Sequence, residues 1–290
     1  MAKKLFGKIR GHDNAEKEFL ATLRADCQIG FDHQSNPIVI PEIRGFTCFE
    51  KLPVVVGSIA ATSDLQLSVI GTGTEVIARA ASGGVNLKSQ VTSPADGDNV
   101  QLYPPATTTL MNSTIRAGSQ LRFRTVLRLN TITAVFASAG IDENAASNDV
   151  DPTGTAGDGA AFLFNAGLAS ELTVDPSLVA GAANTSGADD CQTVPASPYT
   201  HWILTQKVNG VDTFIATNKK VVAGQDYELI ITIEADLKPR WYIDGKLVGT
   251  GVALTADDPV AVNVGLELTA TPGGQKDLDV RFVELARDIG

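Results

Sequence analysis

Apolar and polar residues alternate along most of the chain from residue 54 onward. In residues 120–130, leucine, phenylalanine and threonine fall on one set of alternate positions, and three arginines fall on the other. A period of two is typical of a β-strand with one buried face. The same period recurs in residues 227–233. The pattern predicts an all-β fold for this part of the chain.

The arginines of the first strand, Arg122, Arg124 and Arg128, share one face of it. Alternate residues of a strand lie about 6.6–7 Å apart, so these side chains form a basic stripe. The stripe is either a solvated outer face or a docking surface for carboxylates, such as the acidic segment of a neighbouring subunit.

Two-residue turn signals separate several of the predicted strands. Asn209-Gly210 and Asp244-Gly245 each lie between two strand-like runs, and both favour type I′ turns, in which φ is positive. A third hairpin is predicted where a Gly-Thr-Gly-Thr loop separates residues 65–70 from residues 75–80. Successive hairpins of this kind predict antiparallel sheets.

Polar stretches rich in Pro, Asp, Gly, Ser or Thr interrupt the strands. Residues 92–109, 138–159 and 175–199 are predicted to be loops. Loops of this length in a compact β domain are usually functional surfaces or mobile tips.

Residues 1–53 predict an extension rather than a domain, because the segment is too short to bury its own core. A basic arm precedes a short helix that is expected to begin near Asp13 and end near Cys27, and residues 28–53 are expected to be irregular. The apolar side chains of this extension lie either on its own domain or on a neighbouring subunit. The residues predicted to contact a partner are Lys3, Lys4, Lys8, Arg10, Phe19, Leu23, Arg122, Arg124 and Arg128.

Composition limits the classes of function. The chain has 290 residues, of which 43% are apolar, so it can bury a sizeable core. Its formal net charge is −10, and residues 131–200 contain nine Asp and Glu but no Lys, Arg or His. An acidic protein repels phosphate backbones, which disfavours a nucleic-acid partner. No apolar run is long enough to span a bilayer, and no secretory signal is visible. The three cysteines are far apart in sequence, and they are expected to be free thiols.

Two stretches resemble a known family. Residues 227–251 combine a long strand, a polar break and the sequence WYIDGKLV, and they resemble the late hairpins of concanavalin A-like jelly rolls, the lectin, laminin-G and glucanase group. Residues 157–164, GDGAAFLF, are similar to the D-G-x-A-F strand entry of legume-type lectins. The resemblance implies an antiparallel two-sheet jelly-roll sandwich over residues 54–290. It also implies a sugar-binding role for Asp158 and Gly159, with Trp202 nearby.

The resemblance to jelly-roll glucanases implies a test for catalysis. Those enzymes place three carboxylates on one strand as E-x-D-x-E or E-x-D-x-x-E. Here Glu234 and Asp236 supply two, and Lys238 or Pro239 occupies the third position. Common nucleophile, phosphate-binding and zinc motifs are absent from the sequence. The chain is therefore predicted not to be an enzyme.

A calcium loop is an open alternative within the acidic segment. Asp149 and Asp151 begin a stretch with the spacing of an EF-hand loop, but its twelfth position is Ala160 rather than Glu. The other interpretation is an exposed acidic loop. No cofactor other than Ca²⁺ is predicted.

Three hypotheses of function follow. The first is a virion structural protein, most simply a homo-oligomeric capsid decoration or cement subunit of a tailed bacteriophage. Such a subunit would be assembled in the host cytoplasm on the major capsid protein or another virion protein, with no nucleic-acid or membrane partner. The alternative is a lectin-like carbohydrate-binding module, for example for attachment to a host surface. The third is a glycan hydrolase, which the missing carboxylate disfavours.

Overall fold

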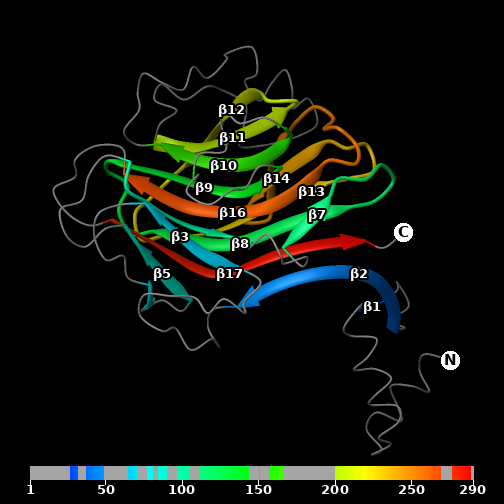
Figure 1. The fold of residues 1–290 in the computed structure, drawn as a ribbon, viewed down its shortest axis with the longest axis horizontal. Coiled ribbons are helices and arrows are strands. Elements are labelled where there is room, and N and C mark those ends of the chain that lie inside the picture. Colours follow the sequence, from blue (N-terminus) through cyan, green and yellow to red (C-terminus); the bar gives the residue numbers. More distant parts are fainter. Residues whose placement is uncertain are drawn as a thin grey trace, which may run out of the picture.

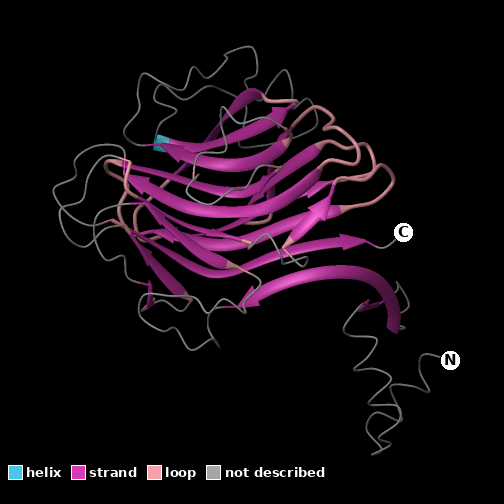
Figure 2. Cartoon of the chain, viewed as in Figure 1, coloured by secondary structure: helices cyan, strands magenta, loops and turns pink. Residues whose placement is uncertain are grey.

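The computed structural model describes residues 27–31, 37–48, 65–70, 77–80, 84–89, 97–104, 111–143, 150, 157–165, 200–268 and 276–288. These residues form two antiparallel β-sheets packed face to face, as Figure 1 and Figure 2 show. The predicted fold class, an all-β antiparallel sandwich, is confirmed. The described part of the chain holds no helix with the length and hydropathy needed to cross a membrane.

The first sheet has nine strands. Its strands are β1 (Cys27–Phe31), β2 (Pro37–Cys48), β4 (Ile77–Arg79), β5 (Val85–Lys88), β8 (Leu121–Leu129), β13 (Asp226–Ile233), β14 (Pro239–Ile243), β15 (Lys246–Thr250) and β17 (Asp277–Asp288). The main path runs β1-β2-β17-β8-β13-β14-β15, while β5 pairs with β17 and β4 pairs with β5.

The second sheet has eight strands. Its strands are β3 (Gln66–Ile70), β6 (Asn99–Tyr103), β7 (Asn112–Thr114), β9 (Val135–Asp142), β10 (Gly159–Asn165), β11 (His201–Val208), β12 (Val211–Lys220) and β16 (Pro259–Leu268). The main path runs β12-β11-β10-β9-β16-β6-β3, and β7 pairs with β16.

The main core lies between the two sheets and is mostly aliphatic, with a few large aromatic residues at its centre. Trp202 packs edge-on against Phe162, Phe164 and Tyr227, with ring centroids 5.6–6.3 Å apart. Along β8, residues on the core face are buried and the residues between them are half-buried. The alternation in the sequence therefore predicts the buried face of this strand correctly.

A second apolar cluster lies on the opposite face of the eight-stranded sheet. Phe136, Ala161, Leu163 and Ile203 are buried there with Val150. The Ser138 hydroxyl, on the same face of β9, donates to the backbone carbonyl of Val150. As a result, the central strands β9 and β10 are buried on both faces.

Both predicted type I′ turns are present. Asn209 and Gly210 have φ values of 50° and 77° between β11 and β12. Asp244 and Gly245 have φ values of 51° and 77° between β14 and β15. Positive φ at both central residues matches the right-handed twist of the flanking strands.

Several local predictions were wrong. Residues 65–70 and 75–80 do not form a hairpin, because β3 pairs with β6 in one sheet and β4 pairs with β5 in the other. Strand β6 lies inside the predicted loop 92–109, and β9 extends into the predicted loop 138–159. Periodicity identifies a strand but does not identify the strand that pairs with it.

The N-terminal extension contains a β-hairpin where irregular structure was predicted. Glu42–Cys48 of β2 pair with Asp288–Phe282 of β17, whereas Pro37–Pro41 pair with β1. In Figure 1, β2 curves away from the sandwich and β1 lies against its far end. The β17 partners of β2 lie more than 200 residues away, so local sequence does not reveal that pairing. The predicted helix lies outside the described residues, and the division at residue 54 stays a prediction.

Candidate ligand-binding face

Asp158 is buried and serves as a backbone anchor. Its two carboxylate oxygens accept hydrogen bonds from the backbone N–H groups of Asn209, at 2.6 Å, and Thr255, at 2.5 Å. Its own N–H donates to the Glu143 carboxylate at 2.9 Å. The side chain therefore connects the start of β10 to the β11–β12 turn and to the loop before β16. Because it is 0% exposed, it presents no free carboxylate to a sugar in this structure, and its sugar-binding role stays a prediction.

Trp202 and Gly159 are also buried. The Trp202 indole is 0% exposed and lies in the core between the sheets, so it has no open ring face on which a sugar could stack. Gly159 pairs with Asp142 and Lys207 in the middle of the eight-stranded sheet. The three residues predicted to bind carbohydrate thus stabilise the fold, and they do not form an accessible site.

The two acids of the glucanase comparison lie in the turn between β13 and β14. Arg240 contacts both of them, with N–O distances of 3.3 Å to Glu234 and 2.9 Å to Asp236. The hydrogen bond from Arg240 holds the pKa of Asp236 below its ordinary value. An acid catalyst in a glycosidase needs a raised pKa, so Asp236 lacks this property.

The structure describes only some of the remaining predicted site residues. Lys3, Lys4, Lys8, Arg10, Phe19, Leu23, Asp149 and Asp151 lie outside the described residues. Among the residues that the structure describes, no group of three or more His, Cys, Asp or Glu could hold a metal ion.

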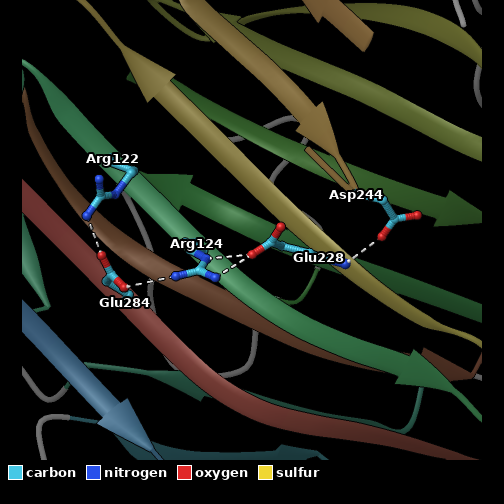
Figure 3. Close-up of polar contacts among 5 residues, drawn as sticks. All are labelled: Arg122, Arg124, Glu228, Asp244 and Glu284. Atoms are coloured by element: carbon cyan, nitrogen blue, oxygen red, sulfur yellow. Dashed lines mark hydrogen bonds and ion pairs between the residues drawn. The ribbon is translucent and has the colours of Figure 1, made fainter. Parts of the chain in front are cut away.

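The arginine stripe lies on the outer face of the nine-stranded sheet, as predicted. Figure 3 shows Arg122 donating to Glu284 at 2.7 Å and Arg124 donating to Glu228 at 2.8 Å. Arg124 also lies 4.0 Å from Glu284, and the Glu228 N–H donates to Asp244 at 3.1 Å. The first two arginines of the stripe thus pair with carboxylates of the adjacent strands β13 and β17.

The third arginine extends this network. Arg128 donates to Asp226 at 2.7 Å, and Arg281 donates to the other oxygen of the same carboxylate. The hydrogen bond from Arg128 is the main cause of a lowered Asp226 pKa, and Arg281 adds to it. The acids that meet the stripe therefore belong to its own sheet. Docking of a neighbour on it stays a prediction.

A different set of polar residues gathers on the outer face of the eight-stranded sheet. Asn99 and Gln101 of β6 and Asn263 of β16 alternate with core residues and are buried. We call these three side chains the amide row. Gln101 donates to Asn263 at 3.1 Å. Tyr103 and Glu267, on the same face, are half-buried, so the row is bordered by partly exposed side chains.

Some polar atoms on this face have no hydrogen-bond partner among the described residues. They include Oδ1 of Asn99 and Oγ1 of Thr205, and both atoms are buried. An unsatisfied buried polar group costs about 1–3 kcal/mol. On the same face, Lys207 binds both carboxylate oxygens of Asp142 at 2.8 Å, with both side chains 3% exposed. This face is thus rich in buried hydrogen-bonding groups.

The amide row was not predicted from the sequence, because residues 92–109 were predicted to be a loop. The available signal was the short alternation Asn99-Val100-Gln101-Leu102-Tyr103. Its apolar members, Val100 and Leu102, enter the core, and its polar members therefore face outward.

Comparison with known proteins supports the fold. No protein-family model and no curated protein sequence matches the chain. A protein of unknown function from Shewanella oneidensis MR-1 matches with a TM-score of 0.52 and 10% identity, over 95% of this chain and 94% of that chain. A β-glucanase from Bacillus licheniformis gives 0.47 and 12%, over 83% and 97%. The carbohydrate-binding module CBM66 from Bacillus subtilis gives 0.39 and 13%, over 75% and 94%. At these identities the likeness is one of fold, which is an antiparallel two-sheet β-sandwich.

Proposed function

We propose that this chain is a non-catalytic carbohydrate-binding protein whose ligand binds the outer face of the eight-stranded sheet. The observation that carries the proposal is Oδ1 of Asn99, which is buried, accepts no hydrogen bond from a described residue, and lies in a cross-strand pair with the half-buried Glu267, where a ligand can make contact. Each amide side chain offers both donors and acceptors. Sugar hydroxyl groups also donate and accept, so the two sets of groups are chemically matched.

The residues bordering the amide row have separate roles in this proposal. Tyr103 supplies an aromatic ring and a phenolic hydroxyl group, which suits a ligand with both apolar and polar faces. Glu267 supplies carboxylate acceptors at the opposite end of the row. Because the chain carries a net charge of −10, it repels acidic polysaccharides. A neutral glycan is the expected ligand.

We propose a non-catalytic protein because of the state of Glu234 and Asp236, the two acids that match part of the glucanase motif. Glu234 and Asp236 both contact Arg240, and the lowered pKa of Asp236 does not suit proton donation at neutral pH.

A glycan array followed by calorimetry tests the proposal. The full chain should bind at least one neutral glycan, and Asn99→Ala should weaken this binding by about tenfold or more. Glu267→Gln, which keeps the side-chain shape, should weaken it less. Asn218→Ala is the matched control, because Asn218 is an exposed amide on β12 and its loss should leave the affinity unchanged. If the full chain bound no glycan, or if the control weakened binding as much as Asn99→Ala, the proposal would fail.

A second function, assembly onto neighbouring subunits, is favoured by the β1–β2 hairpin. Pro37–Pro41 pair with β1 beyond the end of β17. Five residues span about 16 Å, so the hairpin overhangs the sheet by about that length. A two-stranded hairpin alone is marginally stable in water, and a surface on another subunit would stabilise it. The capsid decoration role is one form of this function.

Truncation tests the assembly function. Removing residues 1–36 deletes β1 but keeps Glu42–Cys48, which pair with β17. The shortened chain should remain a folded β-sandwich by circular dichroism. It should also lose co-sedimentation with particles purified from the source of the protein. Undiminished co-sedimentation of the folded, shortened chain would refute the assembly function.

A further inference from the structure

The outer face of the nine-stranded sheet carries a strip of partly exposed apolar side chains. The strip consists of Val126, Ile230, Tyr242, Leu247 and Phe282, all of which are half-buried. Leu247 pairs with Tyr242, Tyr242 with Ile230, and Val126 with Phe282. The strip therefore has one part on β13, β14 and β15 and another on β8 and β17, and the two parts meet diagonally because Ile230 pairs with Arg124 and Val126 pairs with Glu228. We call these five residues the apolar strip.

Arginines surround the apolar strip. Arg122, Arg124, Arg128, Arg240 and Arg281 are all half-buried, and the Arg124 guanidinium lies 5.1 Å from the centre of the Phe282 ring. The strands β8, β13, β14 and β17 contain no lysine. Interfaces between proteins are enriched in aromatic residues and arginine and depleted in lysine. This face resembles an interface in its aromatic residues, its arginines and its lack of lysine on these four strands.

The charges of the face are balanced within it. Arg122 pairs with Glu284, Arg124 with Glu228, Arg128 and Arg281 with Asp226, and Arg240 with Asp236. The chain as a whole carries −10, so this face is close to neutral on an acidic protein. Two copies repel one another through their acidic surfaces and can approach most closely through a neutral one.

We propose that this face is a self-association surface and that its occupant is a second copy of the chain. A two-fold interface requires a patch that is complementary to itself. Alternating arginines and carboxylates meet this requirement, because rotation by 180° can place each charge opposite its counterpart. A partner whose surface carries only one sign of charge would bind this face less favourably, because the guanidinium groups here already contact carboxylates. The two nine-stranded sheets pack face to face, about 10 Å apart.

Analytical ultracentrifugation of the full chain between about 1 and 200 µM tests this proposal by mass action. A dimer that dissociates on dilution is expected. Ile230→Asp, in the middle of the strip, should raise the dimer dissociation constant by about tenfold or more. Leu247→Asp, near the sheet edge, should act in the same direction and disturbs the sheet less.

The matched control is Val211→Asp, which makes the same kind of change at a residue 67% exposed in the other sheet. This variant should dimerise like the unchanged chain, and circular dichroism should show that all three variants are folded. A chain that stays monomeric at every concentration would overturn the proposal. So would folded strip variants that dimerise normally, a control that dissociates equally, or growth into an open-ended polymer.

Discussion

The side chain of Gln206 and the backbone of Val252 exchange two hydrogen bonds. Nε2 of Gln206 donates to the Val252 carbonyl at 2.5 Å, and the Val252 N–H donates to Oε1 at 2.8 Å. Gln206 belongs to β11 of the eight-stranded sheet, whereas Val252 follows β15 of the nine-stranded sheet. One buried amide therefore behaves like a peptide group in a β-ladder and joins the two layers at their margin.

Replacing Gln206 tests this connection. Gln206→Leu keeps the volume but leaves the N–H and carbonyl of Val252 without these partners, which should lower the free energy of unfolding by about 1–3 kcal/mol. Urea denaturation measures the change. Gln225→Leu, in an exposed turn, is the control and should change stability little. Equal stability of the two variants would show that the Gln206 amide contributes nothing.

Substitution of Asp158 distinguishes a structural role of this residue from a sugar-binding role. Asp158→Asn replaces one accepting oxygen with an NH₂ group, so one backbone N–H loses its acceptor and the other keeps only an uncharged one. Hydrogen bonds to charged groups contribute about 1.5–3 kcal/mol, and unfolding by urea should show a loss of that size. Glycan affinity, measured by calorimetry on the folded variant, should stay within about threefold of the unchanged chain. A much larger drop in affinity would restore the predicted binding role.

The ion pairs of Asp226 predict a dependence of stability on pH. Its pKa is lowered in the folded protein, mainly by Arg128 and also by Arg281. The stabilisation is therefore fully present above the unfolded-state pKa, about 3.9. It is lost as the pH falls through the lower, folded-state value. Urea unfolding between pH 6 and pH 2.5 should show a smaller acid-induced loss in Asp226→Asn than in the unchanged chain. Parallel curves would exclude this carboxylate as a contributor.

Gly140 tests the close approach of β9 and β10. A Cβ atom there would lie 2.3 Å from the Ala160 carbonyl oxygen and 2.5 Å from the Ala161 Cα atom. Because these backbone atoms can move only if the sheet is distorted, Gly140→Ala should lower the free energy of unfolding by about 3 kcal/mol. Gly224→Ala has open space but a φ of 76°, so it should cost only about 1 kcal/mol. Thermal denaturation compares the two, and an equal effect would mean that the strands can separate.

Local patterns in the sequence predict much of the fold. The alternation in residues 120–130 identifies β8 and its buried face, and Asn209-Gly210 and Asp244-Gly245 identify two turns. These features depend on neighbours in sequence. The pairing of Cys48 with Phe282 does not, and neither does the separation of residues 65–70 and 75–80 into different sheets. Long-range pairing is decided by the packing of the whole sandwich.

The burial of Asp158 and Trp202 could not be predicted from the sequence for a related reason. Asp158 and Trp202 belong to segments that resemble lectins, but here the carboxylate binds backbone N–H groups and the indole lies in the core. A motif specifies the backbone of a strand entry more strongly than the exposure of its side chains. The arginine stripe was predicted correctly as a shared face, while its partners Glu228 and Glu284 come from strands distant in sequence.

The position of β17 has a consequence for biosynthesis. This strand pairs with β2, β5 and β8, so it lies inside the nine-stranded sheet although it is synthesised after all three of them. Until β17 emerges, the backbone N–H and C=O groups with which β2, β5 and β8 pair to it have no partner strand. All strands of the eight-stranded sheet precede β17 in the chain, so that sheet can form before β17 is synthesised. The nine-stranded sheet closes only when β17 emerges, and in the interval exposed strand edges favour aggregation.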